Sequence, residues 1–301
     1  KLWNLARYVG TQPTPDNEAL ATSRSPHTEE HIVKTDADRW ISEKLTAVTK
    51  SVTQHTDRYE LSLATEELRD FTWGDFADWY VEVHKIEKND VLLRSAFGTI
   101  LRLWHPFMPF VTEAIHQTFR FDPSEFLMIA RWPTPDTVQT EGDIPASQDR
   151  FELLKELIVA IRNTRASYRI EPAKKMSVSV FGPSERLLKE NEAIFQRLAR
   201  VDEIRAIPES VAPDNTIPVQ AGSLQIFLHL EGVIDIAKEK RRIESELTDK
   251  TRYITSLRGR LDDPKFSSRA PEHILAQTKA LLDESLTTVD RLKESLARFD
   301  R

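Results

Sequence analysis

Cysteine is absent from this chain of 301 residues, which excludes disulfide bonds, thiolate nucleophiles and cysteine-ligated zinc, and which fits a reducing compartment. Glycine is scarce, at eight residues, and no glycine-rich loop of the kind that holds phosphates is present. No apolar run approaches the ~20 residues that a membrane-spanning helix needs. No signal peptide or initiator methionine precedes the first helical residues, so we expect a cytoplasmic chain that is part of a longer protein.

Charge is distributed unevenly along the chain, whose net charge is -6. Residues 233–301 carry 15 Lys and Arg against 13 Asp and Glu, whereas residues 1–232 carry 27 against 35. Within Lys238–Arg260, eight basic residues face four acidic ones. A basic segment attached to an acidic body favours an anionic partner for that segment, although a solvated face of a coiled coil would have a similar composition.

Apolar residues recur at helical spacing through the first part of the chain. The predicted helices cover 1–9, a segment beginning at Asp36 or Asp38, 59–71, a segment beginning at Gly74, and a segment capped by Asn89 or Asp90. This last helix leads into residues 102–119, where Pro106 and Pro109 should stop or kink it at His105. Large apolar residues surround both prolines, so we expect the kink in the middle of a helical bundle.

The periodicity changes after Asp149. A helix is predicted over 151–169, and the alternation of Met176, Val178 and Val180 with serines predicts a strand. Further elements are predicted as a helix over 184–200 and strands over 203–207, 216–219 and 223–230. Together these elements indicate a small α/β domain.

A heptad pattern begins at Ile236 and resumes at Leu275, after a turn that contains Pro264. Two such helices joined by a turn predict an antiparallel coiled-coil hairpin, about 40 Å long at 1.5 Å per residue. The predicted fold is therefore mainly α. It comprises a helical bundle over 1–149, a small α/β domain over 150–232 and a C-terminal antiparallel coiled-coil hairpin over 233–301.

Several segments, in order along the chain, resemble class I aminoacyl-tRNA synthetases. Residues 105–117, HPFMPFVTEAIHQ, resemble the HPFMPF-[IV]-TEE-[LI]-W segment in the anticodon-binding domain of the valyl, isoleucyl and leucyl group. Five more segments are similar to valyl-tRNA synthetases in particular: KLWNLARYV (1–9), FTWGDFADWYVEVHK (71–85), RNTRASYRIEP (162–172), VIDIAKEKRRIESEL (233–247) and PKFSSRAPEHI (264–274). The departures are Ala77 in place of Cys, His116 in place of Trp, and an insertion over 11–35.

The resemblance implies the non-catalytic, tRNA-binding C-terminal region of a valyl-tRNA synthetase. In this family the bundle is the anticodon-binding domain, and the coiled-coil arm braces the elbow of a valine-accepting tRNA. No cofactor is expected in this chain, whereas the full-length enzyme would attach valine to tRNA with ATP and Mg²⁺. We further expect a monomer that binds neither DNA nor a membrane.

Bases of single-stranded RNA are read by stacking on aromatic rings and by hydrogen bonds to their edges. Tyr8 offers a ring, Arg7 a forked donor and Asn4 an amide, although Tyr8 could instead only pack against the protein. The predicted anticodon contacts are Asn4, Arg7, Tyr8, Arg162 and Arg165. The predicted contacts of the arm with tRNA are Arg241, Arg242, Arg252, Arg258, Arg260, Lys265 and Arg269.

Two local motifs suggest other chemistry. His27–His31, HTEEH, fits the H-x-x-E-H pattern of a zinc protease, but it follows a proline in a loop and lacks an obvious third ligand. Lys175–Ser179, KMSVS, imitates the ATP-binding KMSKS loop of class I synthetases, but it lacks the second lysine and alternates as a strand. We therefore predict no catalytic residue and no metal site.

Other classes of protein stay open at this point. An isoleucyl or leucyl synthetase is an alternative, although the former often carries a cysteine-bound zinc that this chain cannot hold. A coiled-coil protein-interaction module is a second alternative, and the basic bias of Lys238–Arg260 speaks against it. A hydrolase that uses the HTEEH segment is a third, and it would require bound zinc.

Overall fold

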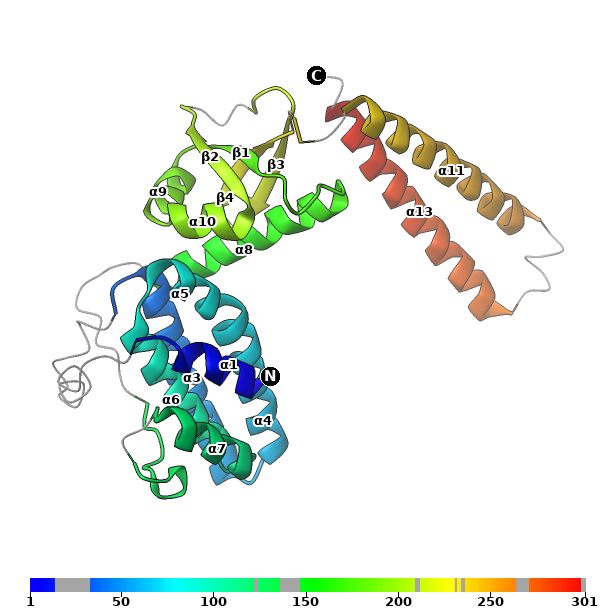
Figure 1. Ribbon diagram of the computed structural model, residues 1–301. Coiled ribbons are helices and arrows are strands. Elements are labelled where there is room, and N and C mark those ends of the chain that lie inside the picture. The colour runs from blue at the N-terminus through cyan, green and yellow to red at the C-terminus, as the bar shows by residue number, and fades with distance from the viewer. Residues whose placement is uncertain are drawn as a thin grey trace. The chain divides into compact units, whose positions relative to one another are not determined.

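The structure is a computed structural model (Figure 1) that describes residues 1–13, 33–121, 124–135, 147–208, 212–230, 232–233, 236–263 and 271–298. The chain divides into two compact units, Lys1–Leu153 and Leu154–Arg301. In its described residues the first unit is helical, whereas the second contains a four-stranded sheet, further helices and a helical hairpin. The predicted fold class, mainly α with a small α/β part, is therefore confirmed. The boundaries of the three predicted domains stay predictions.

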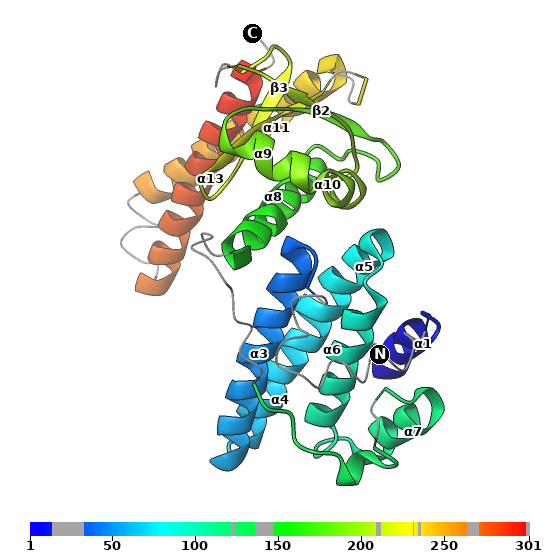
Figure 2. The same cartoon turned by 90° about the vertical axis from the view of Figure 1, so that its left-hand side faces the viewer.

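The first unit is a bundle of helices packed around large apolar side chains, seen from two sides in Figures 1 and 2. Its elements are α1 (Leu2–Gly10), α3 (Asp36–Asp57), α4 (Leu61–Asp70), the π-helix η2 (Phe71–Tyr80), α5 (Val81–Glu87), α6 (Asp90–Trp104), α7 (Pro109–Phe119) and the short 3-10 helix η3 (Leu127–Ile129). Trp40, Phe76 and Phe97 are fully buried. Each helix thus contributes an apolar stripe to one core, as the helical periodicity predicts.

Local capping chemistry sets where two of these helices begin. Asn89 caps α6 as predicted, because its side-chain oxygen accepts a hydrogen bond from the backbone N–H of Leu92 at 3.3 Å. For α3 the prediction of Asp36 or Asp38 is wrong. Its N-cap is Thr35, whose hydroxyl accepts from the backbone N–H of Asp38 at 3.2 Å. Both aspartates lie instead in the first turn of α3, where their charges favour the positive end of the helix dipole.

The predicted helix boundary at Gly74 is wrong, because α4, η2 and α5 follow one another without a break from Leu61 to Glu87. Phe71 and Phe76 are five residues apart and both are buried. That spacing matches the i→i+5 hydrogen bonding of a π-helix, which turns both rings toward the core. Gly74 lies on the exposed side of η2, where it interrupts nothing.

The two prolines act partly as predicted. Helix α6 ends at Trp104, directly before His105, and Pro109 occupies the first turn of α7, where a missing N–H costs nothing. The expectation that this turn lies in the middle of the bundle is wrong. Pro106 is exposed and Phe110 is 91% exposed, whereas Trp104 and Thr112 on either side are buried. The prolines thus carry the chain across the surface between two buried helical segments.

The second unit begins within α8 (Ser147–Ser167), whose Leu157 and Ile161 are fully buried. Its other elements before the hairpin are β1 (Met176–Val180), α9 (Pro183–Glu190), α10 (Glu192–Ala199), β2 (Val201–Ala206), β3 (Thr216–Ala221) and β4 (Leu224–His229). The strand order is β2-β1-β4-β3, with β1 and β2 parallel and the other pairs antiparallel. The single helix predicted over 184–200 is wrong in one respect, because it divides into α9 and α10 at Asn191.

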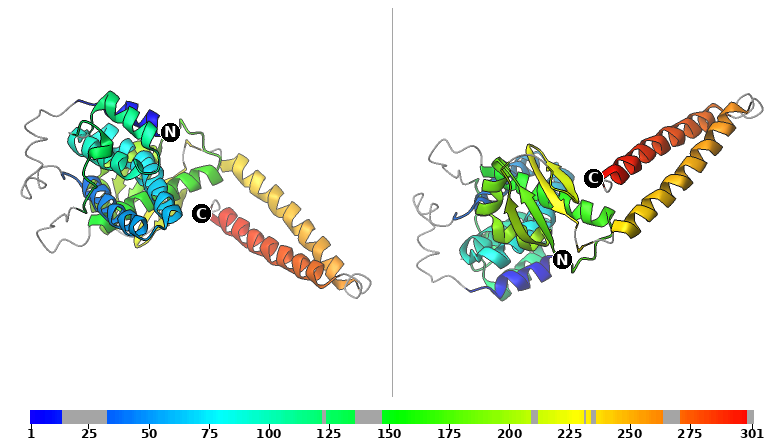
Figure 3. Two further views of the ribbon diagram at one scale, coloured as in Figure 1. Left: turned by 90° about the horizontal axis from the view of Figure 1, so that it is seen from below. Right: turned by 90° about the horizontal axis from the view of Figure 1, so that it is seen from above.

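The last two helices, α11 (Ile236–Asp262) and α13 (Glu272–Arg298), form a hairpin (Figure 3). Residues buried between them include Ile243, Ile254 and Leu257 on α11 and Ser285 and Val289 on α13. These are predicted heptad positions, so the predicted seam is confirmed there. Each helix has 27 residues and is therefore about 40 Å long.

Two glycines of the bundle should respond in opposite ways to alanine. A Cβ atom on Gly98 in α6 would lie 2.7 Å from the backbone carbonyl oxygen of Phe121, whereas a Cβ atom on Gly74 would meet nothing within 4 Å. We expect Gly98→Ala to lower the free energy of unfolding by about 1–3 kcal/mol through overpacking. Gly74→Ala, the control, should raise it by about 0.5–1 kcal/mol through helix propensity. Urea unfolding measures both, and equal shifts would contradict the close packing at Gly98.

Candidate functional site

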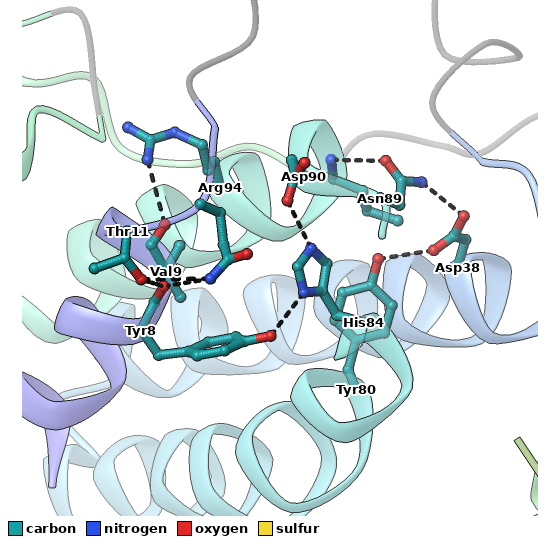
Figure 4. Close-up of polar contacts among 11 residues, drawn as sticks. Tyr8, Val9, Thr11, Asp38, Tyr80, His84, Asn89, Asp90 and Arg94 are labelled. Carbon is teal, nitrogen blue, oxygen red and sulfur yellow. Dashed lines mark hydrogen bonds and ion pairs between the residues drawn. The ribbon is translucent and has the colours of Figure 1, made fainter. Parts of the chain in front are cut away.

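Helix α1 is fixed to the bundle at its C-terminal end (Figure 4). The buried Arg94 donates from Nη1 to the carbonyl oxygen of Val9 at 3.3 Å and from Nη2 to that of Phe119 at 3.4 Å. Gly10 abuts the Phe119 ring so closely that a Cβ atom there would lie 2.2 Å from it. One guanidinium thus joins the carbonyl ends of α1 and α7, where cations are favoured by the helix dipole. The side chains of α1 are therefore held in a defined place.

The outward face of α1 carries the three predicted base-contacting residues of this helix. Asn4 and Arg7 are exposed, whereas Tyr8 is half-buried. Leu2, Ala6 and Val9 form the buried face, so helical geometry alone turns Asn4 and Arg7 to solvent. The structure thus brings an amide, a guanidinium and a phenol together on one short helix.

Tyr8 contacts two residues of α5 and is also partly exposed to solvent. Its hydroxyl lies 2.9 Å from Nδ1 of His84, and the two rings meet edge to face with centroids 5.9 Å apart. The ammonium of Lys85 lies 5.6 Å from the centroid of the Tyr8 ring. The orientation of the ring is therefore set by α5 as well as by α1.

His84 in turn is held by Asp90. Its side chain is fully buried, and Nε2 lies 2.9 Å from Oδ1 of Asp90 at the start of α6. Burial lowers the pKa of the His84 imidazole, and this effect outweighs the hydrogen bond and the charge of Asp90, which act in the opposite direction. His84 is thus a neutral ring at neutral pH, connecting α1 to α6.

A second polar cluster lies next to this one, as Figure 4 shows. The buried Asp38 carboxylate accepts from the hydroxyl of Tyr80 and from Nδ2 of Asn89, each at 2.7 Å, and from the backbone N–H of Lys34 at 3.1 Å. Burial and the neighbouring Asp38 raise the pKa of Tyr80 well above its usual value. Burial also raises the pKa of Glu87 to about 6, against the hydrogen bond from Thr35. These contacts join α3, η2 and the cap of α6.

Sequence reasoning missed the partners of Tyr8. His84 lies within the segment 71–85 that resembles the family, and the sequence indicates Asp90 only as a helix cap. The Tyr8–His84 contact spans 76 positions of sequence, so no local spacing could reveal it.

The predicted sites Arg162 and Arg165 lie on α8 in the second unit, and both donate to backbone carbonyl groups. Nε of Arg162, whose side chain is exposed, donates to Leu198 at 3.1 Å. Arg165 is buried and donates from Nη2 to the carbonyl oxygens of Glu171 at 3.1 Å and Lys174 at 2.6 Å. Burial lowers the pKa of the Arg165 guanidinium. Arg165 thus closes the segment after α8, while a role in RNA binding stays a prediction for both residues.

The predicted basic residues of the arm differ in exposure. Arg241, Arg258 and Arg260 are exposed, while Arg242 is half-buried and pairs with Glu246 at 2.7 Å. Arg252 is exposed and lies 3.1 Å from Asp249. Lys265 and Arg269 lie outside the described residues.

Positive charge is concentrated in the distal half of α11. Residues 250–260 contain four basic and no acidic residues, whereas α13 contains four basic and five acidic ones. Tyr253 in this distal half is 43% exposed, and the ammonium of Lys250 lies 6.0 Å from its ring centroid. The two helices of the arm therefore present different electrostatic surfaces.

Within the described ranges, no group of three or more His, Cys, Asp and Glu side chains could hold a metal ion. The HTEEH segment lies outside these ranges. The KMSVS segment lies mostly in β1, which confirms its prediction as a strand.

No helix in the described part of the chain is both long and apolar enough to cross a membrane.

Comparison with protein families defines the class of both regions. Residues 38–180 match the anticodon-binding domain of tRNA ligase, and residues 235–300 match the valyl tRNA synthetase tRNA binding arm. The first match begins after α1, but the similarity to whole proteins includes that helix. The chain is 34% identical over 98% of its length to the valine–tRNA ligase of Carboxydothermus hydrogenoformans, and 32% identical over its whole length to that of Fusobacterium nucleatum.

The chain thus carries an anticodon-binding domain of the tRNA-ligase class together with a tRNA-binding arm. It belongs to the valyl-tRNA synthetase family, as predicted. It spans about a third of the length of these relatives: 33% of the Carboxydothermus protein and 34% of the Fusobacterium protein.

Proposed function

We propose that this chain recognises tRNA at two places, with the face of α1 reading anticodon bases and the distal half of α11 contacting the elbow. The observation that carries the first part is the exposed Asn4 and Arg7 beside a Tyr8 ring whose position is set by His84. Bases in RNA loops are recognised by such rings and donors. The family matches support the assignment of both regions to tRNA.

The remaining parts of the proposal concern the longer protein to which the relatives correspond. Those relatives are named valine–tRNA ligases, so the tRNA bound would be a valine-accepting one. Valine attachment with ATP and Mg²⁺ would require residues outside this chain. We also propose that the protein acts as a monomer in the cytoplasm, without binding DNA.

The anticodon part of the proposal is tested by Arg7→Ala and Tyr8→Ala. Loss of the ring removes a stacking surface worth about 1–3 kcal/mol per base, so affinity should fall roughly 5- to 150-fold. Electrophoretic shifts with a tRNA bearing a valine anticodon should show this loss. A tRNA in which only the anticodon is changed should show a much smaller loss.

Arg58 and Tyr59 provide a matched control, because they form another Arg–Tyr pair, directly after the C-terminal end of α3. Both are exposed, Tyr59 to 89%. Arg58→Ala and Tyr59→Ala should leave binding of both RNAs unchanged. Equal losses on both RNAs for the α1 variants would mean that Arg7 and Tyr8 only pack or touch the RNA backbone.

A further inference from the structure

Tyr8, His84 and Asp90 are joined by two successive hydrogen bonds. The Asp90 carboxylate at one end determines which group donates in each. An ionised carboxylate can only accept, so the 2.9 Å contact between Asp90 and His84 requires the proton of a neutral ring to lie on Nε2. Nδ1 of His84 then carries a lone pair and must accept. The 2.9 Å contact with Tyr8 is therefore a donation from the Tyr8 hydroxyl into the protein.

This direction restricts what Tyr8 can do toward a ligand. A phenol has one hydrogen to donate, and in Tyr8 that hydrogen is directed to His84. Any further group that approaches the phenolic oxygen must bring its own hydrogen. Figure 4 shows the phenol directed from α1 toward the imidazole, with Asp90 on the far side of that ring.

We propose that Tyr8 meets its RNA base as a hydrogen-bond acceptor and therefore favours a base edge with an amino group, as in adenine or cytosine, and that His84 and Asp90 act as positioning residues for this selectivity. The proposal rests on the anticodon function proposed above. Uracil presents a carbonyl oxygen where cytosine has its amino group, and this oxygen would face the phenolic oxygen without a hydrogen between them. The one donor on the pairing edge of uracil, its N3–H, lies between two carbonyl oxygens that would crowd the phenolic oxygen.

The charged groups near His84 favour a fixed direction for the hydrogen bond, from the Tyr8 hydroxyl to Nδ1 of His84. They are Asp90 on α6, Asp38 on α3 and Lys88 at the end of α5. Of these, Asp90 makes the direct contact with the ring. Burial keeps the His84 side chain away from bulk water, so exchange of its tautomer would leave the Asp90 carboxylate facing an imidazole lone pair.

The test uses anticodon stem-loops in which single amino groups are deleted. Purine riboside replaces adenosine, and 2-pyrimidinone riboside replaces cytidine, at one anticodon position at a time. We expect the chain to bind one of these RNAs roughly 3- to 10-fold more weakly than the parent, the range for one neutral hydrogen bond. Tyr8→Phe retains the ring and should bind both members of that pair equally.

The roles of His84 and Asp90 are tested by the ratio of two affinities, that for the parent RNA and that for the RNA lacking one amino group. His84→Leu removes the acceptor for the phenol, and Asp90→Asn no longer fixes the His84 tautomer, so each should reduce the preference toward one. Circular dichroism checks that each variant is folded, and Asp90→Asn provides the test if His84→Leu does not fold. The ratio between two RNAs is insensitive to a uniform loss of active protein, which a purely structural role would produce.

Three negative results have different meanings. If the chain distinguishes valine from altered anticodons but tolerates every amino deletion, the acceptor role of Tyr8 is wrong while the proposed function stands. If it binds all anticodons equally, the proposed function of the α1 face is wrong as well. If Tyr8→Phe retains the full preference, another residue reads the amino group and the proposal fails.

Discussion

Replacing Arg252, Arg258 and Arg260 by glutamine is expected to reduce the dependence of tRNA affinity on salt, lowering the log–log slope by about 2. All three are exposed in the distal half of α11, where residues 250–260 contain no acidic residue. Binding with fewer phosphate contacts releases fewer counterions from the RNA, and each lost contact lowers the log–log slope by roughly 0.7–0.9. At low salt the affinity should fall on the order of 10- to 100-fold for every tRNA, whatever its anticodon. Filter binding across a salt series measures both quantities.

The control for this experiment lies on the other helix of the same hairpin. Lys279, Arg291 and Lys293 of α13 are also exposed, and their replacement by glutamine removes the same net charge. We expect this variant to retain nearly the full slope. If both variants lose equally, the arm acts only through its overall charge. If neither loses affinity, the hairpin is not an RNA-binding element, and a protein-interaction role gains support.

The second large effect concerns stability. Asp38→Ala should lower the free energy of unfolding by about 3–5 kcal/mol, because it removes a buried acceptor and leaves the hydroxyl of Tyr80 and the amide of Asn89 without their partner. These donors lie on η2 and at the cap of α6, so the loss affects several helices together. Chemical denaturation of the chain monitored by circular dichroism measures the change.

Tyr80→Phe is the graded control for that experiment. It removes one donor and leaves the Asp38 carboxylate its two others, so we expect a loss of about 1.5–3 kcal/mol, typical of a hydrogen bond to a charged group. A loss for Asp38→Ala no larger than that for Tyr80→Phe would contradict the view that Asp38 joins three elements.

Much of the fold could be predicted because its signals are local. Helical periodicity located most helices, the cap of α6 was narrowed to Asn89 or Asp90, and the heptads located the hairpin. The errors arose where two residues offer similar chemistry or where the core overrides a local signal. Thr35 and the aspartates after it can all cap a helix, and the backbone conformation of Thr35 decides between them. Gly74 is a weak helix former, but burial of Phe71 and Phe76 keeps the chain helical around it.

The candidate site was predictable only in part for the same reason. Asn4, Arg7 and Tyr8 share one helix, so their common placement follows from spacing. The hydrogen bonds that direct Tyr8 come from α5 and α6, and only the tertiary structure brings them to α1. Arg165 shows the converse. It is predicted as an anticodon contact, whereas its guanidinium is buried against carbonyl groups of its own unit.

The π-helix η2 has a consequence for insertions and deletions. Helices α4 and α5 belong to one continuous helical run, so the number of residues in η2 sets the rotation of α5 relative to α4. Removing or adding one residue that is not absorbed by a change in the hydrogen-bonding pattern would turn everything beyond it by about 100°. Tyr80 and His84 would then no longer face Asp38 and Tyr8. The length of this segment is therefore as constrained as the identity of the residues that it positions.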